Sequence, residues 1–118
     1  MAIKQTPDQT PDQTFDDRDI GQLEAEAARV AGILKLLANE SRLLILCHLA
    51  MAGEMPVGQL SETIGLSQSA LSQHLAKLRA DGLVDFRRQS QTLFYRLADA
   101  QAARLLSALK DIYCPNIT

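Results

Sequence analysis

The sequence predicts a mainly α-helical fold with one β-hairpin, in the order helix, helix, helix-turn-helix, hairpin, helix. Apolar residues recur every three or four positions over residues 17–37 and 99–113, which is the period of a helix. Over residues 84–97 they alternate with polar residues, which is the period of a strand. Gly65-Leu66-Ser67 joins two short helical segments, as the turn of a helix-turn-helix does. A helix-turn-helix followed by a hairpin, the wing, predicts a winged helix-turn-helix domain (α-α-α-α-β-β-α).

Capping residues and helix breakers delimit the predicted elements. Asn and Ser side chains accept hydrogen bonds from the first free amides of a helix, and glycine ends helices because it tolerates left-handed backbone. Proline stops a helix because it has no amide hydrogen. The expected boundaries are Asn39 and Gly53 for the second helix, Pro56 and Gly65 for the third, Ser67 and Asp81-Gly82 for the fourth, and Asp99 and Pro115 for the last. The basic segment from Arg87 to Gln91 is expected to form the tip of the wing.

The first 15 residues differ in composition from the rest of the chain. They repeat Thr-Pro-Asp-Gln and hold few apolar side chains. Such a segment cannot bury enough surface to offset the entropy lost on ordering. We therefore predict a disordered tail at residues 1–15, and a single winged-helix DNA-binding and dimerisation domain at residues 16–118.

Charge is distributed unevenly along this chain of 118 residues, whose formal net charge is −2. Residues 1–30 hold three basic and seven acidic side chains, whereas residues 66–97 hold five basic and two acidic ones. A locally basic segment is what DNA binding requires, even in an acidic protein. The longest apolar stretch, residues 43–52, is too short to span a bilayer, and the N-terminus has no signal-peptide pattern. We therefore expect a cytoplasmic protein with no membrane partner.

One face of the fourth helix is suited to double-stranded DNA. Leu71, Leu75 and Leu78 share a side and are expected in the core. The opposite side is small and polar, so it can enter the major groove and bond to base edges, while flanking cations reach phosphates. An ordinary solvated helix face is the alternative, and the basic hairpin behind it favours DNA. The expected DNA-binding residues are Ser67, Gln68, Ser69, Ser72, Gln73, Lys77, Arg79, Arg87 and Arg88. We expect His74, at the edge of the core, to be a satisfied structural residue or a phosphate-side residue rather than a ligand.

The first and last helices each carry an apolar stripe outside this DNA-reading unit. A chain of this length has little else to cover both stripes. Helix-turn-helix proteins generally read paired half-sites, so we predict a homodimer whose interface includes these helices. The alternative is that both stripes pack against the chain's own core.

Three segments together resemble the ArsR/SmtB family of bacterial repressors. They are residues 38–46 (ANESRLLIL), 65–84 (GLSQSALSQHLAKLRADGLV) and 95–97 (YRL). The resemblance covers about residues 17–115 and implies a homodimeric winged-helix repressor that leaves operator DNA when an effector binds. The sequence departs from the family at the wing tip, where Gln89-Ser90-Gln91 replaces the Gly-Arg turn of many relatives.

The metal sites of the family cannot be assembled from this sequence. Residues 54–60, at the start of the third helix, contain no cysteine, and the last helix has Asp99 and Asp111 but no histidine. Zinc and related ions require several convergent nitrogen or sulfur ligands. We therefore predict no metal site and no cofactor.

The two cysteines are the candidate effector-sensing thiols. Disulfides in cytoplasmic proteins are usually transient or redox-sensing. Residues 44–49 around Cys47 and 109–115 around Cys114 resemble the sulfide-responsive, SqrR/BigR/YgaV-like branch of the family. The resemblance implies that persulfide or polysulfide links these two thiols by a disulfide or polysulfide bridge. The repressor then leaves the DNA and sulfide-detoxification genes are expressed. Lys110, one turn before Cys114, is the nearest cation in sequence that could activate a thiol.

Other interpretations of the cysteines stay open. Cys47 lies on a mostly apolar helix, where a free cysteine is often a small core residue. Within the same fold, a repressor that responds to peroxide or to haem would also use a cysteine. A thiol oxidoreductase is the alternative from another class. The chain has no Cys-x-x-Cys motif and no catalytic constellation, so we predict that it is not an enzyme.

Overall fold

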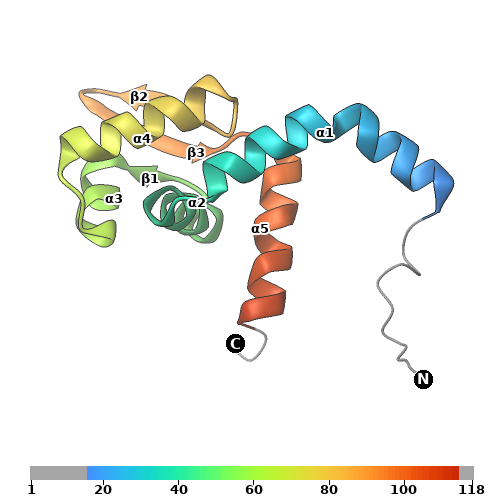
Figure 1. Ribbon diagram of the computed structural model, residues 1–118. Coiled ribbons are helices and arrows are strands. Elements are labelled where there is room, and N and C mark those ends of the chain that lie inside the picture. Colours follow the sequence, from blue (N-terminus) through green and yellow to red (C-terminus); the bar gives the residue numbers. More distant parts are fainter. Residues whose placement is uncertain (1–15, 115–118) are drawn as a thin grey trace. The chain divides into compact units, whose positions relative to one another are not determined.

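The computed structural model describes residues 16–114 (Figure 1). The chain divides into two compact units, residues 1–32 and 33–118. The tail predicted at residues 1–15 lies outside the described residues, as does Pro115. The elements are α1 (Asp17–Leu37), α2 (Glu40–Ala52), β1 (Met55–Pro56), α3 (Val57–Ile64), α4 (Gln68–Ala80), β2 (Val84–Gln89), β3 (Thr92–Leu97) and α5 (Ala100–Tyr113).

The first unit contains the greater part of α1. This helix begins with a reciprocal capping arrangement, in which the Asp19 amide donates to Asp16 Oδ1 (2.9 Å) and the Asp16 amide to Asp19 Oδ2 (3.1 Å). The hydrogen bond from the Asp19 amide is the main cause that holds the pKa of Asp16 below its ordinary value. In this unit Ile20 and Leu23 are exposed.

The second unit contains the hydrophobic core. Leucines of α2, α3 and α4 meet the first residue of β2 there, and nine large side chains are fully buried: Ile45, Leu46, Leu49, Leu60, Leu71, Leu75, Leu78, Leu83 and Val84. Ala102 and Leu106 of α5 are buried in the same cluster. The three leucines of α4 that the sequence placed in the core are therefore confirmed.

The helix ends follow the predicted caps. Asn39 Oδ1 accepts a hydrogen bond from the Arg42 amide (3.0 Å), and Ser67 Oγ accepts one from the Ala70 amide (3.2 Å). Gly65 ends α3 in the left-handed conformation (φ +82°), which suits glycine. The Ser61 carbonyl accepts from the amides of Gly65 and Leu66, and this closes the turn between α3 and α4.

A three-stranded antiparallel sheet, in the order β1-β3-β2, packs beside α4. Strand β1 was not predicted, because two residues are too short to show a period. The hairpin also differs from the prediction at its tip. Arg87, Arg88 and Gln89 pair with β3 up to Gln89–Thr92, so only Ser90 and Gln91 form the turn. Ser90 has φ +56° and occupies the left-handed region that favours glycine.

Candidate DNA-binding surface and thiol pair

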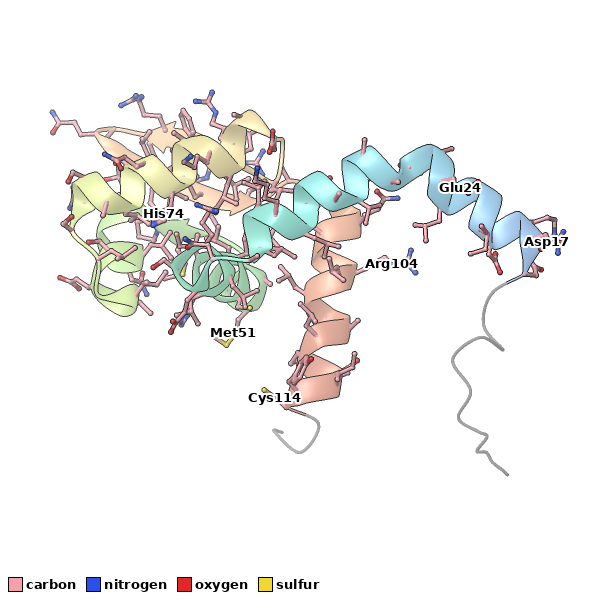
Figure 2. All side chains as sticks on the ribbon, viewed as in Figure 1. Asp17, Glu24, Met51, His74, Arg104 and Cys114 are labelled. Carbon is pink, nitrogen blue, oxygen red and sulfur yellow. The ribbon has the colours of Figure 1, made fainter. Side chains whose placement is uncertain are left out.

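Helix α4 presents the predicted polar face to solvent. Its core side is formed by the buried Leu71, Leu75 and Leu78. The predicted DNA-binding residues of the helix and its cap are all exposed: Ser67, Gln68, Ser69, Ser72, Gln73, Lys77 and Arg79. No bulky apolar side chain stands on that face, so it can lie in a major groove. Figure 2 shows α4 with polar side chains along its outer side.

The C-terminal end of α4 is joined to the wing by aromatic contacts. The Arg79 guanidinium lies 4.4 Å from the centroid of the Phe86 ring, and the Phe86 and Tyr95 rings are 5.3 Å apart. A guanidinium over an aromatic face is attracted by the ring quadrupole. The stack therefore packs the base of the hairpin against α4.

Arg87 and Arg88, the two arginines of β2, face opposite sides of the hairpin. Arg88 follows Phe86 by two residues, so both project from the sheet face that contacts α4 through Arg79. Arg88 is exposed, and no residue within 16–114 forms an ion pair with it. Arg87 projects from the other face, where it donates two hydrogen bonds to the carboxylate of Glu54. Of these two arginines, Arg88 is thus the one without an ion pair within residues 16–114.

Glu54 and Phe94 are functional candidates that sequence reasoning missed. The Arg87 guanidinium lies 4.5 Å from the centroid of the Phe94 ring and pairs with Glu54. Strand alternation could have placed Arg87 opposite Phe94. No sequence signal joins Arg87 to Glu54, because their separation is 33 residues.

His74 differs from its prediction. It is partly buried on α4, and its Nδ1 is buried without a hydrogen-bond partner among residues 16–114. Burial is the main cause that lowers the pKa of His74, and the charges of Arg42 and Lys77 lower it further. The expectation that this histidine is satisfied was therefore wrong for Nδ1, and the alternative of a phosphate-side residue stays a prediction.

The thiol groups of Cys47 and Cys114 belong to neighbouring helices, since α2 packs against α5. Cys47 is an exposed residue of α2, so it is not a core side chain of the chain. Partial burial of its sulfur is the main cause that raises the pKa of Cys47, and the charge of the Cys114 thiolate raises it further.

Cys114 lies directly after α5, partly exposed, and its amide donates to the Lys110 carbonyl (2.7 Å). In Figure 2 its sulfur turns to the side of α5 on which Met51 of α2 lies. The Lys110 ammonium, which we considered as an activating group, instead pairs with Asp111 Oδ1 (3.2 Å).

An exposed apolar surface surrounds the cysteines. Leu44, Cys47 and Met51 share one face of α2, and Ile112 and Tyr113 lie just before Cys114. Met51 is 78% exposed and Tyr113 is 77% exposed. Large apolar side chains so exposed mark a surface that a partner covers.

The described residues, 16–114, also bear on the predicted absence of a membrane partner and of a metal site. No helix there is both long and apolar enough to cross a membrane. Within residues 16–114, no three His, Cys, Asp or Glu side chains are grouped so that they could hold a metal ion.

A capped helix with an exposed polar face, a helix-turn-helix and an adjoining basic hairpin define a winged helix-turn-helix DNA-binding protein. Residues 39–85 match the family model described as bacterial regulatory protein, arsR family. The chain is 46% identical over 96 residues to the transcriptional activator HlyU of Vibrio cholerae, covering 81% of this chain and 88% of that protein. The chain therefore belongs to the arsR family, and it is a DNA-binding transcriptional regulator.

Solved structures agree with this assignment. The transcriptional repressor BigR of Xylella fastidiosa superposes with a TM-score of 0.76 at 43% identity, over 80% of this chain and 96% of BigR. The homodimeric winged helix-turn-helix DNA-binding domain of a possible ArsR-family regulator of Mycobacterium bovis superposes with a TM-score of 0.65 at 34% identity. That match covers 83% of this chain and 86% of the domain.

Proposed function

We propose that this regulator is a homodimeric cytoplasmic repressor that leaves operator DNA when polysulfide or persulfide links Cys47 to Cys114. One observation carries the proposal: α2, which bears an exposed thiol, packs against α5, which is directly followed by a second, partly exposed thiol. The resemblance to sulfide-responsive repressors and the match with BigR support it.

In the proposed complex, α4 lies in the major groove and the wing follows the phosphate backbone. Gln73 and the neighbouring serines contact base edges, and Lys77, Arg79 and Arg88 neutralise phosphates. Ser67 acts mainly as the helix cap, because its hydroxyl already accepts from the Ala70 amide. Arg87 contributes through its ion pair with Glu54.

A second copy of the chain is proposed to cover the apolar surface on α2 and α5. The relative from Mycobacterium bovis is described as homodimeric, which supports a dimer. Two copies would present two α4 helices to half-sites about 34–36 Å apart. A small change in this spacing weakens both half-site contacts at once, so a dimer amplifies a small movement at the thiols.

The linking reaction balances without a further oxidant. Two thiols and a polysulfide with hydrogen at both ends give a bridge and two molecules of hydrogen sulfide. The cysteine sulfurs are oxidised, the two terminal sulfurs of the polysulfide are reduced and leave, and any inner sulfurs stay in the bridge. One thiolate attacks the polysulfide first and releases one hydrogen sulfide, and the second cysteine closes the bridge and releases the other.

A movement of α2 caused by its link to α5 can be transmitted to the DNA-binding elements through short connections. Helix α2 packs against α3 and α4, and only Gly53 separates it from Glu54, which holds the wing. A disulfide requires Cα atoms about 4.4–6.8 Å apart, whereas a bridge with inserted sulfur spans more. A pair of thiols set wider than this limit would respond to sulfur donors better than to peroxide.

The effector is tested by fluorescence anisotropy on a DNA duplex selected by the reduced protein from a random library. Separate samples receive polysulfide, hydrogen peroxide, diamide and haem, and mass spectrometry identifies the product at each cysteine. Release by polysulfide alone, with Cys47 linked to Cys114, supports the proposal. Release by peroxide or haem at equal efficiency would assign a general thiol sensor or a haem-responsive regulator instead.

A further inference from the structure

The outer face of the wing carries a compact cluster of four residues, Glu54, Arg87, Gln89 and Phe94, termed the wing clamp below. Arg87 Nε donates to Glu54 Oε2 (3.0 Å) and Arg87 Nη2 to Glu54 Oε1 (2.9 Å). Arg87 Nη1 donates to Gln89 Oε1 (2.7 Å), and the guanidinium lies 4.5 Å from the Phe94 ring centroid. One guanidinium thus makes four contacts.

The wing clamp spans the full width of the sheet. Arg87 belongs to β2 and is paired with Phe94 of the central strand β3, which in turn pairs with Pro56 of β1. Glu54 directly precedes β1. The Arg87 side chain therefore reaches across β3 and anchors the hairpin to the segment that follows α2.

The wing clamp also neutralises the charge of Arg87. The Glu54 carboxylate neutralises the guanidinium in a double hydrogen bond, and three of its nitrogens are donors to protein groups. A neutralised pair releases few counterions from DNA. Arg88, on the opposite face and without an ion pair in residues 16–114, keeps its charge available.

We infer that the wing clamp holds the hairpin at the angle needed for DNA, which makes the acidic Glu54 a positioning residue and leaves Arg88 as the phosphate contact of the wing. The inference rests on the proposed contact between wing and DNA. The inference predicts a change in DNA affinity opposite in direction to the one expected from charge alone. Removing a negative charge near DNA ordinarily strengthens binding, whereas loss of the wing clamp weakens it.

The test compares Glu54→Gln, Arg87→Lys and Arg88→Ala with a matched control, Glu62→Gln, which removes the same charge from an exposed position of α3. Anisotropy on the selected duplex gives Kd at several salt concentrations, and thermal unfolding by circular dichroism verifies that each variant is folded. Arg87→Lys keeps the charge but cannot make the double hydrogen bond.

We expect Glu54→Gln and Arg87→Lys each to weaken binding about two- to fivefold, with the dependence of log Kd on log salt unchanged. We expect Arg88→Ala to weaken binding and to lower that salt slope by about one. Glu62→Gln should not weaken binding.

Two results would overturn the inference but would not contradict the proposed contact between the wing and DNA. Tighter binding of Glu54→Gln with a steeper salt slope would show that Arg87 contacts phosphate and that Glu54 masks it. Unchanged binding of Glu54→Gln would show that the wing clamp does not position the wing. An Arg88→Ala variant with unchanged affinity and slope would instead refute the proposed wing contact, and the inference with it.

Discussion

The DNA-binding face of α4 and the thiol face of α2 and α5 are built in different ways. The α4 face depends on one continuous segment, in which buried leucines, a Ser67 cap and exposed polar residues alternate at helical spacing. The thiol face combines Cys47 and Cys114, which are far apart in sequence and belong to parts of the chain that adjoin because α2 packs against α5. The first face recognises a ligand by local chemistry. The second face is proposed to respond to chemistry that changes how two helices are held together.

The largest effect is expected on the recognition face. Changing Gln73→Ala removes an exposed amide that can bond adenine in two places, each such contact being worth about 1–3 kcal/mol of discrimination. Anisotropy should show a roughly 10- to 100-fold loss of affinity for the selected duplex and a smaller loss for random DNA. Gln22→Ala, the same change on α1, serves as the control. Equal losses on both DNAs would mean that Gln73 does not read bases.

The Cys114→Ser variant tests the thiol face. This change removes the thiolate charge that helps to raise the pKa of Cys47, so that pKa should move down towards 9.0. It should stay above 9.0, because burial is the larger cause. The rate of Cys47 alkylation by iodoacetamide, followed by mass spectrometry against pH, measures the shift. An unchanged pH profile would contradict the electrostatic effect of Cys114 on Cys47. DNA binding by the reduced form of the variant should equal that of the unmodified protein.

A smaller effect concerns His74, which lies behind the recognition face. Its pKa is below 6.5 in the folded state, so the unfolded chain takes up a proton at higher pH than the folded chain does. The free energy of unfolding contributed by His74 is therefore fully present above about pH 6.5 and is lost as pH falls through the folded pKa. Urea unfolding between pH 7 and 5 should show a weaker pH dependence for His74→Gln than for the unmodified protein. Parallel curves would contradict this assignment.

The smallest effect is expected at the wing tip. Ser90 has φ +56°, where glycine is favoured, so Ser90→Gly should raise the unfolding free energy by at most about 1 kcal/mol. Thermal unfolding measures this change, and Thr92→Gly on the adjoining strand should be destabilising. A destabilised Ser90→Gly variant would show that the turn is not strained by its side chain.

The local features of the fold could be predicted from sequence because each is encoded within a few residues. The Asn39 and Ser67 caps, the buried leucines of α4 and the hairpin all follow from spacing and residue type. Strand β1 could not be predicted, because it exists only through pairing with β3. The tip was predicted too long, since strand pairing continues to Gln89.

The candidate sites were harder to predict where they depend on tertiary contacts. Helix α2 is apolar on most sides, so sequence alone could not decide whether Cys47 is buried or exposed. The ion pair of Glu54 with Arg87 and the unpartnered Nδ1 of His74 also arise only from packing. The DNA-binding role of the residues on α4 and the wing stays a prediction, as does the sensing role of the thiols.

The central claim is that linking α2 to α5 weakens DNA binding. The most direct measurement prepares reduced protein and protein with a Cys47–Cys114 bridge, separates them, and determines Kd for the same duplex. We predict that the linked form binds about 5- to 150-fold more weakly, the usual range of allosteric coupling, and that reductant restores binding. The Cys47→Ser and Cys114→Ser variants should bind normally with or without polysulfide. Equal affinity of the linked and reduced forms would contradict the account.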